Sequence, residues 1–296
     1  RFPDAALTNI FREIISACRS LEAPIRIAYF GALGSFTHEA ALRIFGASSN
    51  LSSCREVGDV FEEVESEKAD YGVVPVENSI EGVVNRTFDM FLTSRLGIIA
   101  ESYLQVHHCL LSSEKKVTGI KKILSHPQPF AQCRAWLKRH VPDAKLVETS
   151  STSEAAKMAR GKKGVAAIAS WKASETYGVP VLFENIEDNP DNVTRFAVIA
   201  RECKTQRTGD DRSSVFFSIP DRPGTLETIL QFIAKNGINM SKIVSRPSQR
   251  KAFEYSFFIE LEGHRDDPKL AGCLAEIEKK STFFRLVGSY PRSKMI

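Results

Sequence analysis

Two segments far apart in the chain place hydroxyl, amide and charged side chains together at the end of an expected strand. Residues 75–82 read PVENSIEG, and residues 192–196 read NVTRF. In each, neutral hydrogen-bond donors lie beside a charged group and away from any His, Cys or metal-like cluster. Such a site can hold an anion and donate hydrogen bonds, whereas metal or thiol chemistry needs other side chains. The two segments therefore indicate an anion site rich in neutral donors.

Three further segments place hydroxyl groups where a strand is expected to lead into a helix. They read GALGSFTH at 31–38, SHPQPFAQC at 125–133 and SSTSE at 150–154. In the first, two glycines allow a tight turn and either Ser35 or Thr37 can cap the helix, so that free N–H groups face an anion. A dinucleotide site is disfavoured because the third glycine of GxGxxG is absent. The third segment is either a plain capping box or a second anion cradle facing the first.

His126 and Cys133 lie in the middle segment of the three. His126 is a candidate general base by type, and a loop histidine held by backbone hydrogen bonds is an equal alternative. A Cys–His nucleophile is formally available, but a Pro-Gln-Pro stretch separates the two residues. Nucleophilic catalysis by Cys133 is therefore disfavoured.

Taken together, these segments resemble the prephenate dehydratase family, and the resemblance covers nearly the whole chain. Where the family usually has Gly-Pro-x-Gly-Thr-Phe, this chain has Ala32 and Ser35, so the hydroxyl is kept. The resemblance implies catalytic roles for Thr194 and Glu77. It implies substrate binding by Ser35, Asn78, Ser79, Ser125, Gln132, Ser151, Thr152, Arg195 and Phe196.

The implied reaction removes CO₂ and hydroxide from prephenate and gives aromatic phenylpyruvate. Most of the driving force lies in the substrate, so the enzyme must hold two carboxylates and assist the departing oxygen. We expect Thr194 to donate a hydrogen bond to that oxygen, with Glu77 as the rival proton source. Arg195 offers a bidentate fork for a carboxylate. Neither a cofactor nor a metal is required.

Element periodicity predicts an α/β protein with an extra helix at its start. Apolar residues recur at helical spacing over residues 4–22, and the helix resembles the last helix of a chorismate mutase domain. One helix cannot supply a mutase site, so we expect no mutase activity. Residues 25–203 alternate short strands with helices, with one strand-like run at 98–111. The resemblance implies a two-lobed, type II periplasmic-binding-protein-like catalytic domain there.

A polar linker is expected at residues 204–212, followed by a ferredoxin-like βαββαβ pattern over 213–296. This pattern, with DRPGTL at 221–226, resembles the ACT amino-acid-sensing domain. The resemblance implies feedback by L-phenylalanine at a subunit interface of a homodimer or homotetramer. Val244 lacks an acid usual in the family, and Glu227 places one nearby. The implied effector residues are Gly224, Thr225, Leu226, Glu227, Val244, Ser245, Arg246 and Pro247.

Composition is that of an ordinary cytoplasmic globular protein. Hydrophobic residues make up 43% of the chain, and a net charge of +4 with interspersed signs gives no nucleic-acid footprint. The six cysteines have no CxxC spacing and are expected to be reduced thiols. No apolar run reaches membrane-spanning length. The alternatives left open are arogenate as the substrate and a non-catalytic ligand-binding regulator that uses the same cleft.

Overall fold

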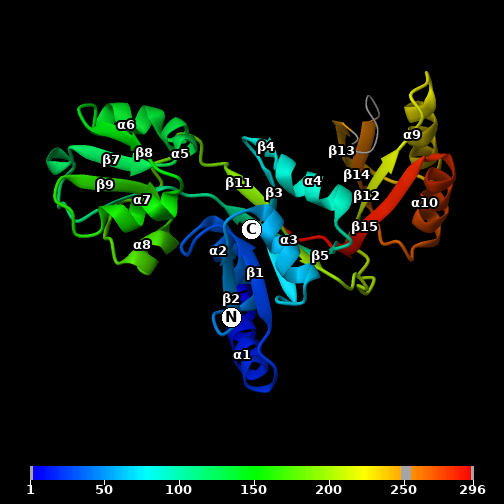
Figure 1. Ribbon diagram of the computed structural model, residues 1–296, viewed down its shortest axis with the longest axis horizontal. Coiled ribbons are helices and arrows are strands. Elements are labelled where there is room, and N and C mark those ends of the chain that lie inside the picture. Colours follow the sequence, from blue (N-terminus) through cyan, green and yellow to red (C-terminus); the bar gives the residue numbers. More distant parts are fainter. Residues whose placement is uncertain (1–2, 248–254, 295–296) are drawn as a thin grey trace.

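The computed structural model describes residues 3–247 and 255–294, which form three sheets arranged side by side (Figure 1). Two of the sheets belong to two lobes, and the third belongs to a C-terminal domain that packs against the first lobe. The N-terminal helix α1 (Asp4–Glu22) extends below the first lobe. This is the two-lobed α/β architecture with a ferredoxin-like domain that the sequence predicts.

Lobe 1 is built on a sheet of strand order β2-β1-β3-β11-β5, with β4 paired to β3. Strands β1, β2 and β3 are parallel. Strand β11 comes later in the chain, after all the strands of lobe 2, and runs antiparallel to both of its neighbours, β3 and β5. Its elements are β1 (Arg26–Phe30), α2 (Phe36–Phe45), β2 (Asn50–Cys54), α3 (Val57–Glu65), β3 (Tyr71–Asn78), β4 (Gly82–Val83), α4 (Asn85–Thr93), β5 (Gly97–Gln105) and β11 (Val193–Ala200).

Lobe 2 lies between β5 and β11 in the chain and has the strand order β10-β6-β9-β7-β8. Its alanine-rich core lets α7 pack close to the sheet, because small side chains shorten the distance between layers. Its elements are β6 (Cys109–Ser112), η1 (Val117–Gly119), β7 (Lys122–Ser125), α5 (Pro127–Gln132), α6 (Arg134–His140), β8 (Lys145–Glu148), α7 (Thr152–Ala159), β9 (Val165–Ala169), α8 (Trp171–Tyr177) and β10 (Val181–Phe183).

The chain crosses between the lobes twice, at residues 106–108 and 184–192. The single strand expected at 98–111 is therefore wrong: β5 and β6 belong to different lobes, and the crossing lies between them. Besides these crossings, α8 of lobe 2 contacts the turn before α2, where the Ser170 hydroxyl donates to Gly34 O at 2.7 Å. Gly34 has a φ of +77°, and a Cβ there would lie 2.9 Å from Ala173 Cα. A glycine is thus needed for this close approach.

The C-terminal domain is an antiparallel sheet of order β13-β14-β12-β15, with two helices on one face. The other face packs on lobe 1, where Phe258 meets Phe88 edge-on with ring centroids 4.6 Å apart. The two domains thereby share one hydrophobic core. The elements are β12 (Asp211–Ser218), α9 (Thr225–Lys235), β13 (Met240–Pro247), β14 (Tyr255–Glu262), α10 (Pro268–Lys280) and β15 (Phe283–Pro291).

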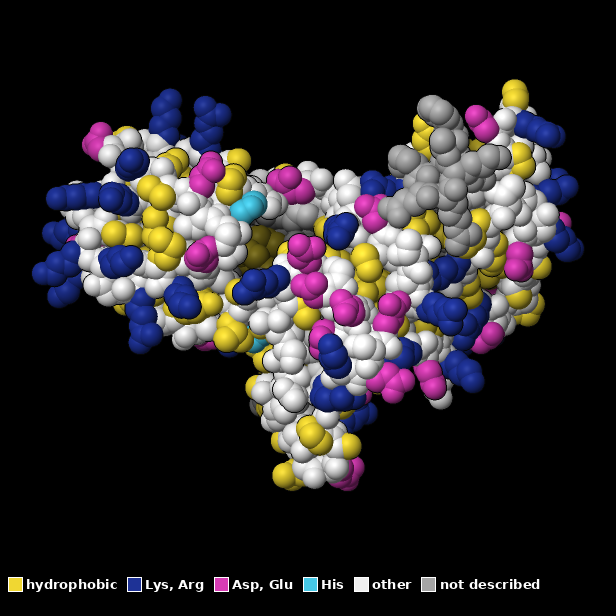
Figure 2. Space-filling view, in the orientation of Figure 1, with side chains coloured by type: hydrophobic (Ala, Val, Ile, Leu, Met, Phe, Trp, Pro, Cys, Tyr) yellow, Lys and Arg dark blue, Asp and Glu magenta, His cyan; other side chains and the backbone are white. Residues whose placement is uncertain are grey.

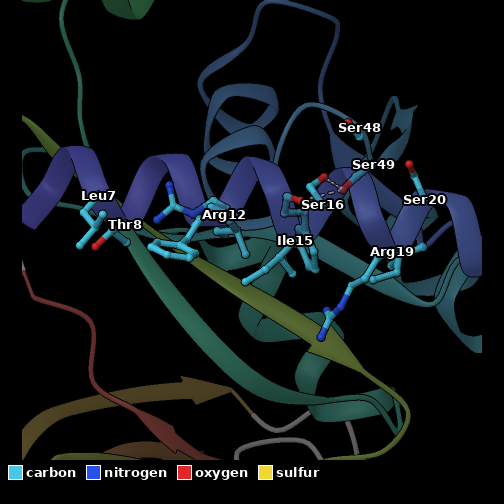
Figure 3. Close-up of a pocket in the computed structure, with 13 residues that line it drawn as sticks. Leu7, Thr8, Arg12, Ile15, Ser16, Arg19, Ser20, Ser48 and Ser49 are labelled. Carbon is cyan, nitrogen blue, oxygen red and sulfur yellow. Dashed lines mark hydrogen bonds between the residues drawn. The ribbon is translucent and has the colours of Figure 1, made fainter.

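Helix α1 lies against the end of α2, where Ser16 is buried over Gly46. Between them is a cavity of about 480 Å³, lined by small polar side chains, by Arg12 and Arg19 (Figure 3), and by apolar side chains that include Phe11 and Ile15. Both of these side chains remain about half exposed, so α1 uses little of its apolar stripe within the described chain. No helix within the described ranges is both long enough and apolar enough to cross a membrane.

Candidate active site between the lobes

A cleft of about 450 Å³ lies between the lobes, and residues from both lobes and both crossings line it. Figure 2 shows the surface hollowed there. The cleft lining contains Phe30, Phe36, Thr37, Pro75, Asn78, Glu81, Gly82, Val83, Val84, Val106, His108, His126, Gln128, Pro129, Gln132, Ser150, Ser151, Thr152, Asn192, Thr194 and Phe196. Among these lining residues there is no lysine or arginine, so an anion in the cleft would be held by neutral donors.

A bulge in β3 sets which side chains face the cleft. Thr194 pairs with Asn78 and Arg195 with Glu77, but Phe196 then pairs with Pro75, so β3 has one extra residue at this point. Side chains normally alternate between the two faces of a sheet, and a bulge breaks that alternation. As a result Pro75 and Asn78 both line the cleft although three positions separate them.

A chain of side-chain amides runs from the backbone of lobe 1 across the hinge. It starts at Asn78, whose Oδ1 accepts the backbone N–H groups of Ile80 and Glu81 at 3.0 Å each. The Asn78 amide nitrogen must then be the donor, and it donates to Asn192 Oδ1 at 2.7 Å. Asn192 Nδ2 in turn donates to Gln132 Oε1 at 3.3 Å. Backbone N–H groups therefore fix the direction of the whole chain, since a peptide N–H can only donate.

The same direction orients the Thr194 hydroxyl. Asn78 Nδ2 also donates to Thr194 Oγ1, at 2.9 Å, so the threonine oxygen is an acceptor in this contact. Within the described part of the chain, no acceptor takes the hydroxyl hydrogen of Thr194. The hydroxyl is half-buried at the cleft wall and is free to donate to a bound ligand.

His108, in the first crossing between the lobes, ends the amide chain, and no sequence motif points to it. Its Nε2 lies 2.7 Å from Gln132 Oε1, which can only accept, so Nε2 carries the hydrogen and Nδ1 is bare. Burial lowers the pKa of His108, which favours the neutral form of the ring. Within the described residues, His108 Nδ1 and Gln132 Nε2 are both buried without a hydrogen-bond partner. Such groups are costly unless a ligand or water completes them.

Two helices begin at the cleft, one from each lobe. Ser35 caps α2 by accepting His38 N at 3.2 Å, and Ser151 caps α7 by accepting Glu154 N at 3.1 Å. The earlier N–H groups of each first turn have no intrahelical acceptor and face the helix entrance. Thr37 and Thr152 of these first turns both line the cleft. Helix N-termini of this kind attract anions without a cationic side chain.

Comparison with known proteins assigns the family. Residues 27–204 match the profile of the family described as "Prephenate dehydratase", and residues 213–279 match that of the "ACT domain". The chain belongs to the prephenate dehydratase family. A bifunctional chorismate mutase/prephenate dehydratase of Aquifex aeolicus is 45% identical over 99% of this chain and 80% of its own length.

Solved and plant relatives of the family agree with this assignment. The crystal structure of an Arthrobacter aurescens prephenate dehydratase in complex with L-Phe matches with a TM-score of 0.83 at 35% identity, covering 90% of each chain. An Arabidopsis thaliana protein named arogenate dehydratase/prephenate dehydratase 1 is 34% identical over 91% of this chain and 73% of its own length. The family and its ACT domain are thus those that the sequence motifs indicate.

The expectation that Arg195 and Glu77 face the substrate is wrong for this structure. Neither lines the cleft, because each lies one position from a cleft residue and therefore projects from the opposite face of the sheet. Arg195 is buried and donates to Glu260 of β14 at 2.7 and 3.0 Å. Glu77 contacts the Lys242 ammonium group of β13. Both charges are therefore committed to the ACT domain.

Two predicted serines are also turned away from the cleft. The Ser125 hydroxyl is fully buried and donates to Ile168 O at 3.0 Å, so it fixes β7 beside β9. Ser79 donates to Asp191 O and accepts Val193 N, both at 3.0 Å, which ties the end of β3 to the crossing before β11. The structure thus brings together Asn78, Gln132, Ser151, Thr152, Thr194 and Phe196, with Ser35 as the cap of α2.

The remaining chemistry considered from the sequence has specific places. His126 lines the cleft and caps α5 by accepting Gln128 N at 3.4 Å. All six cysteines are free, and burial raises the pKa of Cys133, which makes it a poor nucleophile. Across residues 3–247 and 255–294, no three His, Cys, Asp or Glu side chains form a group that could hold a metal ion.

The predicted effector segments meet at one end of the ACT sheet. Ser218, just before the turn that leads to Gly224 and Thr225, pairs with Ser256, and Ser256 pairs with Arg246. Gly224 has the left-handed φ of +84° that suits a glycine before a helix. Leu226 packs in the ACT core, and Glu227 accepts a hydrogen bond from Gln231. Val244 packs towards lobe 1, whereas Ser245 is exposed. The side chain of Pro247 lies outside the described residues.

Proposed function

We propose that this chain converts prephenate to phenylpyruvate, CO₂ and water in L-phenylalanine biosynthesis. The observation that carries the proposal is the Thr194 hydroxyl, which Asn78 holds as an acceptor so that its hydrogen is directed to a ligand. It lies in a cleft between two lobes, beside the uncommitted Gln132 Nε2. A family built for this reaction needs such a donor at the departing oxygen.

Substrate binding follows from the two helix entrances. Prephenate carries two carboxylates, and the first turns of α2 and α7 offer two sets of backbone N–H groups on opposite walls of the cleft. Phe196 and Pro75 supply apolar surface for the ring between them. No guanidinium is needed in this arrangement, which replaces the fork expected of Arg195.

The step itself is a decarboxylative elimination. The bond between the ring and its carboxylate breaks, its electron pair enters the ring, and the hydroxyl at the para position leaves. Thr194 donates a hydrogen bond to that oxygen, and one proton taken up from solvent completes the water molecule. The dianion thus gives the phenylpyruvate anion, CO₂ and water, and no electron acceptor is involved. Because Glu77 is committed to Lys242, it has no part in this step.

Incubation of the purified chain with prephenate tests the proposal, with phenylpyruvate absorbance as the readout. Parallel reactions contain arogenate, with phenylalanine as the product measured, because the Arabidopsis relative carries that name and Glu81 in the cleft could pair with an ammonium group. We expect faster turnover of prephenate. Faster turnover of arogenate would reassign the substrate, and binding without any product would indicate a regulator that uses the same cleft.

L-phenylalanine is the proposed feedback inhibitor, acting at the ACT domain. The solved Arthrobacter relative contains L-Phe, and this chain brings its two candidate effector segments to one end of the sheet. Calorimetry should give heat with phenylalanine. Heat with tyrosine or tryptophan and none with phenylalanine would change the effector. A homodimer or homotetramer in the cytoplasm completes the proposal, and sedimentation of the purified chain would measure the assembly.

A further inference from the structure

A cluster of six ionised side chains fills the interface between lobe 1 and the ACT sheet. Each domain supplies three of them, and all except Glu77 are buried or nearly so. The lobe 1 members are Glu77, Glu101 and Arg195, and the ACT members are Arg212, Lys242 and Glu260. Lobe 1 thus contributes one excess negative charge and the ACT domain one excess positive charge, so the cluster is neutral only when the domains are docked.

The contacts run continuously through the cluster. Arg195 donates to both oxygens of Glu260, at 2.7 and 3.0 Å, and to Glu101 at 3.2 Å. Arg212 donates to the same Glu101 oxygen at 2.6 Å. At the other end, Glu77 lies between Arg195, at 3.5 Å, and Lys242. Each of the three carboxylates therefore has a cationic partner in lobe 1 and another in the ACT domain.

This cluster lies directly behind the candidate catalytic pair. Glu77 precedes Asn78 on β3, and Arg195 follows Thr194 on β11, in matched register across the two strands. Neighbouring residues project from opposite faces of a sheet. The cleft side chains and the cluster side chains therefore lie on opposite faces of the same paired segments of β3 and β11. A displacement of either charged side chain would therefore move the Asn78–Thr194 hydrogen bond.

We propose that Glu77 and Arg195 are positioning residues that fix the Asn78–Thr194 pair, and that Lys242 and Glu260 of the ACT domain hold them in place. The ACT sheet is then a structural part of the active site as well as a sensor. This inference rests on the proposed function, because it concerns how the same cleft is aligned. A misplacement of about 1 Å in a catalytic group can lower turnover by about two orders of magnitude.

The test compares variants of the ACT side chains in the full-length protein. Lys242→Met should lower kcat for prephenate about tenfold with KM changed less than about twofold, because substrate contacts remain while Thr194 is misaligned. Lys242→Arg, which restores a cation, should recover most of the loss. Glu260→Gln should act in the same direction. Lys279→Met removes a lysine from an exposed pair with Glu276 of the ACT helix α10 and should leave both constants unchanged.

A second readout does not depend on turnover. Hydrogen exchange at the amides of Ser79 and Val193, which join β3 to the start of β11, should be faster in Lys242→Met than in the parent protein. Unchanged exchange together with kcat within twofold of the parent would overturn the inference, as would a loss expressed only in KM. Absence of turnover in the parent protein would instead refute the proposed function. The exchange result would still test whether Lys242 holds the Asn78–Thr194 segment in place.

Discussion

Replacing Asn78 with aspartate changes one nitrogen to oxygen and should reverse the direction of the Thr194 hydroxyl. In the parent protein the amide nitrogen donates to Thr194 Oγ1 at 2.9 Å and leaves the hydroxyl hydrogen for the substrate. A carboxylate at this position can only accept, so Thr194 would donate to Asp rather than to the departing oxygen. The contact to Asn192 Oδ1 at 2.7 Å would become a repulsion between two oxygens.

The expected magnitude follows from the loss of one directed donor. Such donors are worth about 2.7–4 kcal/mol in the transition state, which is about 100- to 1000-fold in kcat. The added negative charge in a cleft meant for a dianion should also raise KM. Phenylpyruvate formation under saturating prephenate measures the first effect, and the substrate dependence of the initial rate measures the second.

A matched control makes the result specific. Asn189 lies in the crossing at residues 184–192, which also contains Asn192, and is exposed. Its Oδ1 accepts Asp191 N at 2.9 Å. Because aspartate can accept that same hydrogen bond, Asn189→Asp should leave turnover within about twofold of the parent, since exposed substitutions are usually near neutral. If folded Asn78→Asp retained kcat within tenfold of the parent, the oriented threonine would not be the main source of rate enhancement.

Three further outcomes follow from the same structure. Arg195→Met should lower the free energy of unfolding by about 3–5 kcal/mol in urea titrations, because it leaves buried carboxylates unpaired, whereas the exposed Arg43→Met should change it by less than about 1 kcal/mol. The parent protein should lose stability as pH falls below about 6.5. Burial lowers the pKa of His108 in the folded state, so the unfolded chain takes up a proton on this histidine at a higher pH than the folded chain does. His108→Gln should therefore reduce the dependence of the free energy of unfolding on pH. An equal slope in both proteins would contradict the neutral assignment. Gly34→Ala should lower kcat/KM about tenfold, because its Cβ would meet Ala173 at 2.9 Å and alter the lobe contact; unaltered kinetics would show that this contact does not set the cleft.

The fold and the cleft could be predicted from the sequence, but the face that each strand residue presents could not. Thr194 and Arg195 are neighbours, so strand geometry requires that they project from opposite faces. The sequence does not show which face meets the substrate, because the partner of Arg195 is Glu260 on a separate domain. The bulge in β3 adds a second obstacle, since it shifts the alternation between Pro75 and Asn78, and the proline inside the strand is the only sequence signal of it.

His108 was missed for a related reason. It lies inside the strand-like run at 98–111, where a histidine is more simply interpreted as a structural residue than as a site residue. The run is longer than strands usually are, and that length was the available signal for a crossing between lobes. For Ser125, only the family resemblance implies a place in the site, whereas its hydroxyl joins β7 to β9.

Side-by-side turnover of Thr194→Val and Thr194→Ser tests the central claim most directly. Valine keeps the shape of threonine and removes the hydroxyl, while serine keeps the hydroxyl and removes a methyl group. The predicted result is a fall in kcat of about 100-fold or more for valine and less than about tenfold for serine, with KM nearly unchanged in both. Equal rates for the two variants, or near-parent turnover by the folded valine variant, would contradict the role of the Thr194 hydroxyl.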